Sequence, residues 1–268
     1  MNQQTKPTVL TTALITGASS GIGATYADRL AHRGHNLVLV ARDVARMTAL
    51  AERLRKETGV EIDIIGADLA NNAELKKVEI RLREDHRIGL LVNNAGAGAP
   101  GGFISGDADL QDQVIRLNVT AVTRLAAAVI PRFVAAGVGS IINIASVVAL
   151  APELPMGMYG ATKSYVLTYS MALHQELGDK GLYVQAVLPA ATRTEIWERS
   201  GIDVNTLQGV MEVGEMVDAA LVGFDRRELI TIPSLPDATQ WDSFNGARQA
   251  MLGNFSQVHA AERYRTAA

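Results

Sequence analysis

The chain has 268 residues and carries 25 Lys and Arg against 28 Asp and Glu, a formal net charge of −3. This near-balance excludes a strongly basic nucleic-acid-binding protein. Hydrophobic residues make up 48% and charged residues 20%, which is typical of a globular protein with a sizeable core. Cysteine is absent, so disulfides and sulfur-ligated zinc are excluded, and the composition is compatible with a reducing compartment.

The N-terminal sequence MNQQTKPTVLTT is polar and lacks the apolar core of a signal peptide. No uninterrupted apolar run approaches the ~20 residues that cross a bilayer. We therefore expect a soluble, cytoplasmic protein without membrane contact.

Apolar runs alternate along the chain with segments that have helical spacing. Strands are expected at 12–16, 37–40, 61–65, 88–92, 140–144, 182–188 and 228–232. Helices are expected at 22–33, 44–58, 72–86, 108–134 and 157–178, with a long connection at 190–211 and a helix and tail within 236–268. This alternation predicts an α/β fold, namely a Rossmann-type doubly wound parallel sheet of about seven strands with helices on both faces. No linker is evident, so we expect one domain over 1–268.

The sequence TGASSGIG at 16–23 lies between the first strand and the first helix. Glycines at this turn allow a diphosphate to approach the backbone, and the helix N-terminus stabilises its charge. Glycine-rich turns also occur for packing alone, but this one opens a complete βαβ unit. The turn lacks the Gly-Lys-Ser/Thr of ATP-binding loops, which disfavours ATP chemistry.

The end of the second strand indicates which dinucleotide is preferred. NAD-binding proteins usually place a carboxylate there, but this chain has Ala41 followed by Arg42. An arginine can bind a 2′-phosphate that a carboxylate would repel. We predict NADP(H), with Arg42 as the main contact and Ser19 and Arg46 as helpers. The alternative is that Arg42 is a solvated charge beside Asp43.

Tyr159 and Lys163 are four residues apart near the start of a predicted helix and so share one of its faces. An ammonium that close favours the phenolate, which predicts a lowered pKa and a tyrosine able to act as acid or base. The alternative is a half-exposed aromatic ring beside a solvated charge.

These motifs together closely resemble the short-chain dehydrogenase/reductase family, from about residue 11 to about residue 194. The resemblance rests on the glycine loop, Asn93-Asn94-Ala95-Gly96, Asp68-Leu69, and Ser146 placed 13 residues before Tyr159. It implies a nucleotide-binding and catalytic frame over 11–194, with 195–268 as a substrate lid and C-terminal cover. The catalytic residues that it implies are Asn118, Ser146, Tyr159 and Lys163.

In that family the serine polarises a carbonyl and the tyrosine transfers the proton, so Ser146 and Tyr159 are expected to do so here. Lys163 would hold the nicotinamide ribose, and the backbone of Asn118 would hold a water that relays protons. The expected cofactor-binding residues are Gly17, Ser19, Ser20, Gly21, Ile22, Gly23, Arg42, Asp68, Leu69, Asn94, Ala95, Gly96, Tyr159, Lys163, Pro189, Thr192 and Thr194. By the same resemblance, helices 108–134 and 157–178 would pair in a homodimer or homotetramer.

One position departs from the family pattern. Pro189 is followed by Ala190 where the family usually has glycine. A positive φ at this alanine would cost roughly 1 kcal/mol, unless the loop takes a different path. Thr192 through its backbone and Thr194 through its hydroxyl would still hold the carboxamide.

The substrate pocket is expected under residues 195–215, with Met156 and Met158 approaching and with Glu153, Leu154 and Trp197 on its wall. Trp197 could instead pack the lid against the core. The five histidines lack ligand spacing, so no metal site is expected. We predict interconversion of a ketone or aldehyde with an alcohol. The alternatives are a 3-oxoacyl thioester reductase, a hydroxysteroid dehydrogenase, or a non-catalytic dinucleotide sensor.

Overall fold

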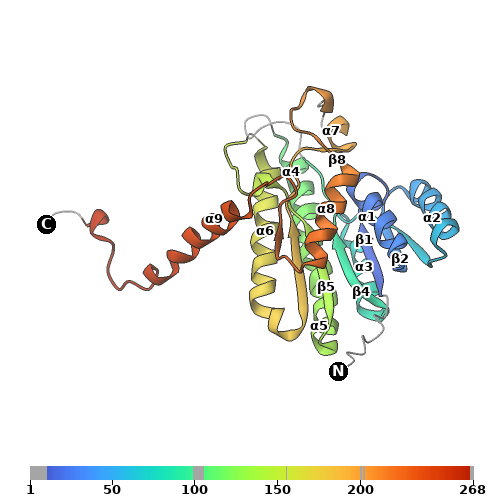
Figure 1. The fold of residues 1–268 in the computed structure, drawn as a ribbon, viewed down its shortest axis with the longest axis horizontal. Helices are drawn as coiled ribbons and strands as arrows, with labels where there is room; N and C mark the ends of the chain where they lie inside the picture. The colour runs from blue at the N-terminus through green and yellow to red at the C-terminus, as the bar shows by residue number, and fades with distance from the viewer. Residues whose placement is uncertain (1–10, 99–105, 155, 200, 202, 266–268) are drawn as a thin grey trace. The chain divides into compact units, whose positions relative to one another are not determined.

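The main sheet has seven parallel strands in the order β3-β2-β1-β4-β5-β6-β9 in this computed structural model (Figure 1). The structure describes residues 11–98, 106–154, 156–199, 201 and 203–265, so most of the polar N-terminal sequence lies outside them. The strands are β1 (Thr12–Thr16), β2 (Leu37–Ala41), β3 (Ile62–Gly66), β4 (Ile88–Asn93), β5 (Gly139–Ile144), β6 (Leu182–Val187) and β9 (Ile230–Thr231). The predicted seven-stranded Rossmann-type sheet is confirmed.

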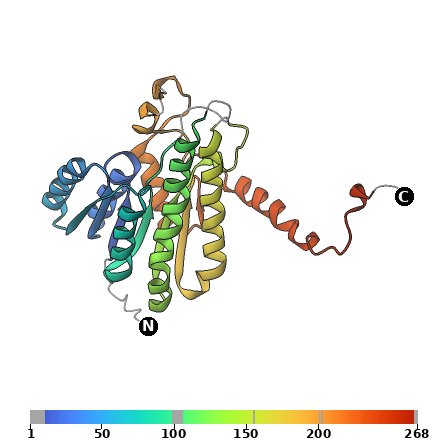
Figure 2. The same ribbon diagram turned by 180° about the vertical axis from the view of Figure 1, so that it is seen from behind.

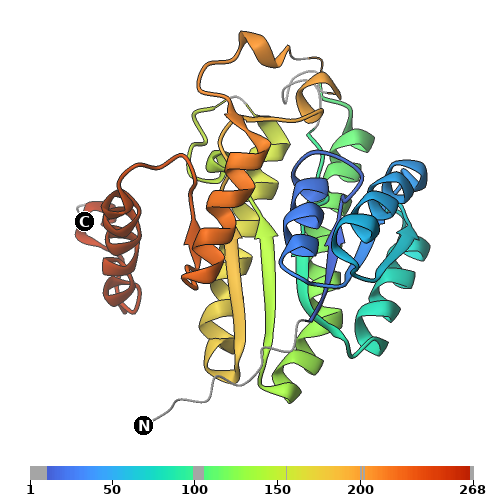
Figure 3. The ribbon, with the colours of Figure 1, turned by 45° about the vertical axis from the view of Figure 1, so that its right-hand side comes forward.

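Helices cover both faces of the sheet because the central strands are apolar on both sides. All five residues of β1 are buried: Ala13 and Ile15 pack in one core cluster and Leu14 packs in the other. The first face is covered by α1 (Gly21–His32), α2 (Val44–Thr58) and α8 (Val213–Asp225), which come forward in Figure 3. The second is covered by α3 (Asn72–Glu84), α5 (Val122–Ala136) and α6 (Gly157–Leu177), which come forward in Figure 2.

Local signals set the ends of α2, the helix that follows Arg42. The carboxylate of Asp43 accepts a hydrogen bond from the backbone N–H of Arg46 (3.0 Å) and so caps the N-terminus. Gly59, with φ of 74°, ends the helix in the left-handed conformation.

The predicted helix 108–134 is divided in the structure. It comprises α4 (Ala108–Ile115), a π-helical segment (Arg116–Ala121) and α5. By length and composition alone, the helical run Ala108–Ala136 is long and apolar enough to cross a membrane. The sequence itself predicted no segment of this kind. Several of its apolar side chains, among them Leu125, Val129 and Phe133, are buried in the core, although only 39% of its apolar stretch is buried. Absence of membrane contact stays a prediction.

The predicted connection 190–211 contains regular structure. Strands β7 (Thr192–Arg193) and β8 (Met211–Glu212) pair in parallel, and α7 (Ile196–Arg199) and a 3₁₀ turn (Val204–Thr206) lie between them. Further 3₁₀ turns are at Val147–Ala149 and Gly178–Lys180.

The chain divides into two compact units, Met1–Pro233 and Ser234–Ala268. The second contains α9 (Ala238–Ala250) and 3₁₀ turns at Leu252–Asn254 and Glu262–Tyr264. None of the residues of α9 is buried. The division of a single domain at residue 194 stays a prediction.

Candidate active site

The predicted site lies at the carboxyl ends of β1 and β4, which are neighbours in the sheet. The chain leaves β1 for α1 on one face and leaves β4 for helices on the other face. In open α/β sheets, ligands bind in the crevice that such a reversal creates.

Two positions, one in the loop between β1 and α1 and one in the first turn of α1, have room only for glycine. A Cβ on Gly17, whose φ is 67°, would lie 2.8 Å from Nδ2 of Asn94. A Cβ on Gly23 would lie 2.3 Å from the carbonyl oxygen of Gly17. Ser20, the N-cap residue of α1, makes no side-chain capping bond. The first N–H groups of a helix have no partner within the helix, so this helix start fits the predicted binding of a diphosphate.

The segment after β4 supports this loop through hydrogen bonds. The hydroxyl of Thr16 accepts from the backbone N–H groups of Asn94 (2.9 Å) and Ala95 (3.0 Å). The side-chain amide of Asn94 donates to the carbonyl of Thr16 at 2.8 Å. The structure thus brings the predicted Asn94, Ala95 and Gly96 beside the glycine loop.

Arg42 is exposed and directly follows the buried end of β2. Within the described residues its guanidinium forms no ion pair or hydrogen bond, so its charge is available for an anion. Ser19 is partly buried in the glycine loop. Arg46 has a different environment, since its Nη1 donates to both carboxylate oxygens of Glu195, at 2.7 and 2.8 Å.

The predicted adenine contacts follow β3. The carboxylate of Asp68 accepts from the N–H of Ala70 (2.9 Å), and the N–H of Asp68 donates to Glu74 (2.6 Å). Leu69 is buried. These bonds fix the turn, and contact with adenine stays a prediction.

The structure brings the four catalytic candidates together. Ser146 follows β5, and Tyr159 and Lys163 lie in the first turns of α6. The Nζ of Lys163 is 5.5 Å from the ring centroid of Tyr159 and donates to the carbonyl of Ile144 at 2.8 Å. A Cβ on Gly96 would lie 3.4 Å from that Nζ and 3.3 Å from Oδ1 of Asn118. Glycine at 96 therefore keeps this corner of the site open.

Asn118 is fully buried in the π-helical segment. Its amide accepts from the N–H of Ala97 (3.0 Å) and donates to the carbonyl of Ala97 (2.9 Å) and the hydroxyl of Thr162 (3.0 Å). These bonds connect the segment after β4 to α6. Short π-helical segments are frequent at functional sites because they move a residue out of the regular helical register.

Burial controls the ionisation of the tyrosine and the lysine. Burial raises the pKa of Tyr159 to about 12, and a contact with the Ser146 hydroxyl only partly opposes it. Burial lowers the pKa of Lys163 to about 8. The predicted lowering of the Tyr159 pKa by Lys163 is therefore wrong for the chain by itself, because the loss of solvation on burial dominates.

The segment after β6 closes one side of the site. The carbonyl of Pro189 accepts from the Ser146 hydroxyl (3.2 Å) and from the N–H of Val147 (3.0 Å). Arg227 is the one described residue other than glycine with a positive φ, so Ala190 takes the different loop path and carries no such strain. Thr192 is buried, and its carbonyl accepts from the indole N–H of Trp197 at 2.8 Å. This bond favours the packing role for Trp197.

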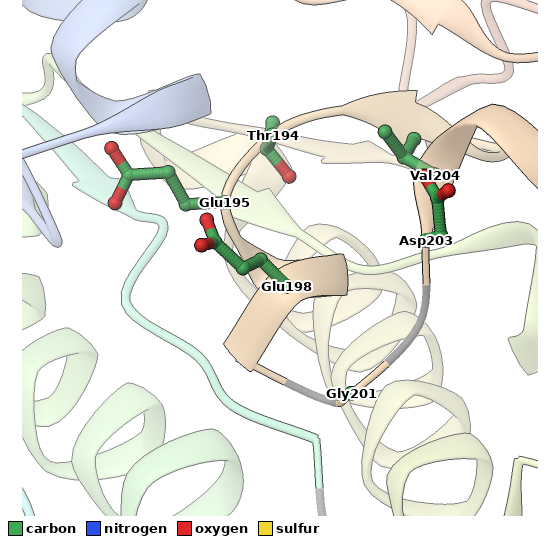
Figure 4. Close-up of a pocket in the computed structure, with 6 residues that line it drawn as sticks. All are labelled: Thr194, Glu195, Glu198, Gly201, Asp203 and Val204. Carbon is green, nitrogen blue, oxygen red and sulfur yellow. The ribbon is translucent and has the colours of Figure 1, made fainter.

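A cavity of about 520 Å³ lies within this segment (Figure 4). Its described lining consists of Thr194, Glu195, Glu198, Gly201, Asp203 and Val204. None of the four catalytic candidates is among them, so this cavity is not the whole of the predicted substrate pocket. Among the residues predicted for that pocket, Leu154 is exposed and Met156 and Met158 are partly buried.

Sequence spacing missed one group of possible metal ligands, because its members come from two helices. Asp28 and His32 of α1 lie within 4.8 Å of Glu57 of α2. Arg53 donates to the carboxylates of both Asp28 and Glu57 at 2.7 Å. Arg53 neutralises the two carboxylates that would have to bind a metal cation, so this group is a poor candidate for a metal site.

Comparisons with known proteins agree with this geometry. A family model described as short chain dehydrogenase matches residues 11–205. A short-chain dehydrogenase from Sphingobium yanoikuyae, solved in complex with NADPH, is 63% identical with a TM-score of 0.94, covering 96% of this chain and 100% of that one. A bulky-bulky ketone specific alcohol dehydrogenase from Comamonas testosteroni is 59% identical with a TM-score of 0.90, over 97% and 100% of the two chains.

More distant curated relatives are longer. The 17-beta-hydroxysteroid dehydrogenase type 3 of Mus musculus is 35% identical over 68% of this chain. The chain spans 56% to 60% of the length of such relatives from chicken, mouse and rat.

The parallel sheet, its crevice and the glycine loop define the class of Rossmann-type nucleotide-binding proteins. Within that class, the family match over 11–205 and the grouping of Ser146, Tyr159 and Lys163 are decisive. The chain belongs to the short-chain dehydrogenase family.

Proposed function

We propose that this chain is an NADP(H)-dependent oxidoreductase that interconverts a ketone or aldehyde with an alcohol. The observation that carries the proposal is the grouping of Ser146, Tyr159 and Lys163 at the strand ends, near a tightly packed glycine loop that opens a helix. The NADPH-bound relative at 63% identity supports the cofactor, and the unpaired Arg42 supports the preference for the phosphorylated form.

The residues of the glycine loop would hold the diphosphate, and Arg42 the 2′-phosphate. Lys163 would bind ribose hydroxyls through its buried ammonium. When bound, the nicotinamide supplies or accepts the hydride. Side chains of this protein would polarise the carbonyl and transfer the proton.

Ser146 and Tyr159 act on the substrate oxygen. The Ser146 hydroxyl, which donates to the Pro189 carbonyl in this structure, would turn its hydrogen to the substrate carbonyl and make the carbonyl carbon more electrophilic. The Tyr159 hydroxyl donates its proton to the oxygen as negative charge develops there. The high pKa of Tyr159 keeps that proton in place at neutral pH. Asn118 fixes the position of Thr162, and thereby of the turn that carries Tyr159 and Lys163.

For the substrate we propose a ketone with a bulky group on each side of the carbonyl, or the corresponding secondary alcohol. The support is the 59% identity to the Comamonas enzyme, which is described as specific for bulky-bulky ketones. A 3-oxoacyl thioester and a hydroxysteroid are kept as the alternatives. A cytoplasmic location is proposed on the sequence alone.

The test is a panel of ketones and alcohols assayed with NADPH, NADH and the oxidised forms, with wild type and Tyr159→Phe in parallel. We expect NADPH-dependent reduction of bulky ketones by the wild type. Loss of the proton donor should lower the rate by about 10²- to 10⁴-fold, while NADPH still quenches protein fluorescence. Turnover by Tyr159→Phe at the wild-type rate would contradict the role of the phenol. Dinucleotide binding without turnover of any compound would favour the sensor alternative.

A further inference from the structure

The ion pair between Arg46 and Glu195 joins the start of α2 to the segment that follows β6. Arg46 lies in the first turn of α2, just after Arg42 at the end of β2. Glu195 follows Thr194 in the segment after β6. The side chains are 50% and 41% exposed, and one nitrogen contacts both carboxylate oxygens at 2.7 and 2.8 Å. In Figure 4 Glu195 points toward the blue N-terminal part of the fold, away from Asp203 and Val204.

A second contact places the same segment against the glycine loop. A Cβ on Gly21 would lie 3.2 Å from Cγ2 of Thr194. Two successive residues, Thr194 and Glu195, therefore meet the loop and α2 respectively. The segment 194–195 thus spans from the loop that would hold the diphosphate to the turn that would hold the adenosine ribose.

The guanidinium of Arg46 forms ion pairs with two carboxylates. Besides Glu195, the Nε of Arg46 lies 3.5 Å from Oδ2 of Asp43. The pairing with Glu195 raises the pKa of the guanidinium, as expected for a cation stabilised by an acid. Arg42, by contrast, has no such partner among the described residues. Arg46 is therefore paired with acidic side chains, whereas the charge of Arg42 is available to bind an anion.

We propose that Arg46 and Glu195 form a clamp that closes over the bound dinucleotide and slows its release, whereas Arg42 alone distinguishes NADP(H) from NAD(H). This inference rests on the proposed function for the presence of a dinucleotide. Arg46 and Glu195 are positioning residues. They hold α2 and the segment after β6 together. They do not contact the 2′-phosphate, which is the group that distinguishes NADP(H) from NAD(H).

The clamp predicts a specific pattern of dissociation rates. Stopped-flow fluorescence measures the release of NADPH and of NADH from wild type, Arg46→Ala, Glu195→Gln and Arg42→Ala. Opening the exposed pair should speed release of both dinucleotides by the same factor, about two- to fivefold. Arg42→Ala should speed release of NADPH only. The effect of Glu195→Gln should fade at high salt, because exposed pairs are screened.

Two controls separate the clamp from general damage. Arg53→Ala removes another paired arginine from α2, exposed to a similar extent at 47%, and should leave both release rates unchanged. The exchange Arg46→Glu with Glu195→Arg restores the ion pair in reverse and should restore slow release. A merely destabilised protein would not recover in this way.

Three results would overturn the clamp. The first is a loss confined to NADPH in Arg46→Ala, which would make Arg46 a phosphate contact. The second is unchanged release in Glu195→Gln at low salt. The third is failure of the exchanged pair to restore slow release. If the wild type binds neither dinucleotide, the proposed function fails and the clamp fails with it, whereas binding by wild type with any of these three results rejects the clamp alone.

Discussion

Tyr159 is a protonated phenol at neutral pH, because burial raises its pKa to about 12. A protonated phenol can donate to an alkoxide at once, but it must lose its proton before it can accept one from an alcohol. Lys163, with its pKa lowered to about 8, still carries charge at neutral pH, so its ammonium remains able to donate hydrogen bonds. The ionisation of these residues therefore favours reduction over oxidation near pH 7.

This asymmetry predicts different pH dependence in the two directions. Single-turnover oxidation of an alcohol should accelerate between about pH 6 and 10, because the phenolate fraction grows about tenfold per pH unit below the pKa. Single-turnover reduction should stay nearly level over the lower part of that range. Rapid-mixing measurements of NADPH absorbance test both. An oxidation rate independent of pH would contradict a raised pKa for the catalytic acid.

Some properties of the site residues can be predicted from the sequence, and others depend on the folded structure. The pairing of Tyr159 with Lys163 can be predicted because residues four apart share one face of α6, whereas Ser146 is expected only from the family resemblance. The ionisation of Tyr159 cannot, since it depends on burial by the whole fold. Nor can the pair of Arg46 with Glu195, whose members are 149 residues apart.

At the level of elements, the strands follow from the sequence because burial on both faces demands continuous apolar runs. The division of the helix 108–134 does not follow. The π-helical segment contains Asn118, whose side chain forms hydrogen bonds with Ala97 and Thr162. These residues are distant in the sequence, so no local sequence pattern predicts the bonds. The parallel pair β7 and β8 is similarly hidden, since each strand has two residues.

The glycine loop offers a test of its close packing. Gly23→Ala should lower the free energy of unfolding by about 1–3 kcal/mol and weaken NADPH binding, because the added Cβ would lie 2.3 Å from the carbonyl oxygen of Gly17. Gly160→Ala is the control, since its nearest heavy atoms would be 3.9 Å away. Thermal melting with and without NADPH measures both effects. Equal behaviour of the two variants would show that the loop relaxes freely.

At the scale of the whole molecule, the segment Ser234–Ala268 differs from the rest. The described part of it includes exposed Phe244, Met251, Leu252 and Phe255, and α9 buries no residue. A helix of 13 residues is marginal in water by itself. Packing against another surface would stabilise it.

We expect the full chain to form a homodimer or homotetramer, as the family resemblance implies. Light scattering at working concentration measures the mass, and a chain ending at Pro233 tests whether the last segment contributes. The core clusters lie before residue 234, so this shortened chain should still melt cooperatively. A monomeric full chain would contradict the expected assembly.

The strand order also constrains how the protein is made. Strand β1 pairs with β2 on one side, with Ala13 beside Leu37, and with β4 on the other, with Ile15 beside Val92. While the ribosome is still adding residues before Ile88, β1 to β3 can already assemble, but the second edge of β1 has no partner. An unpaired edge on a strand with an apolar centre, Ala13 to Ile15, invites association with other chains. Pairing of β4 with β1 is therefore the step at which this half-sheet becomes protected.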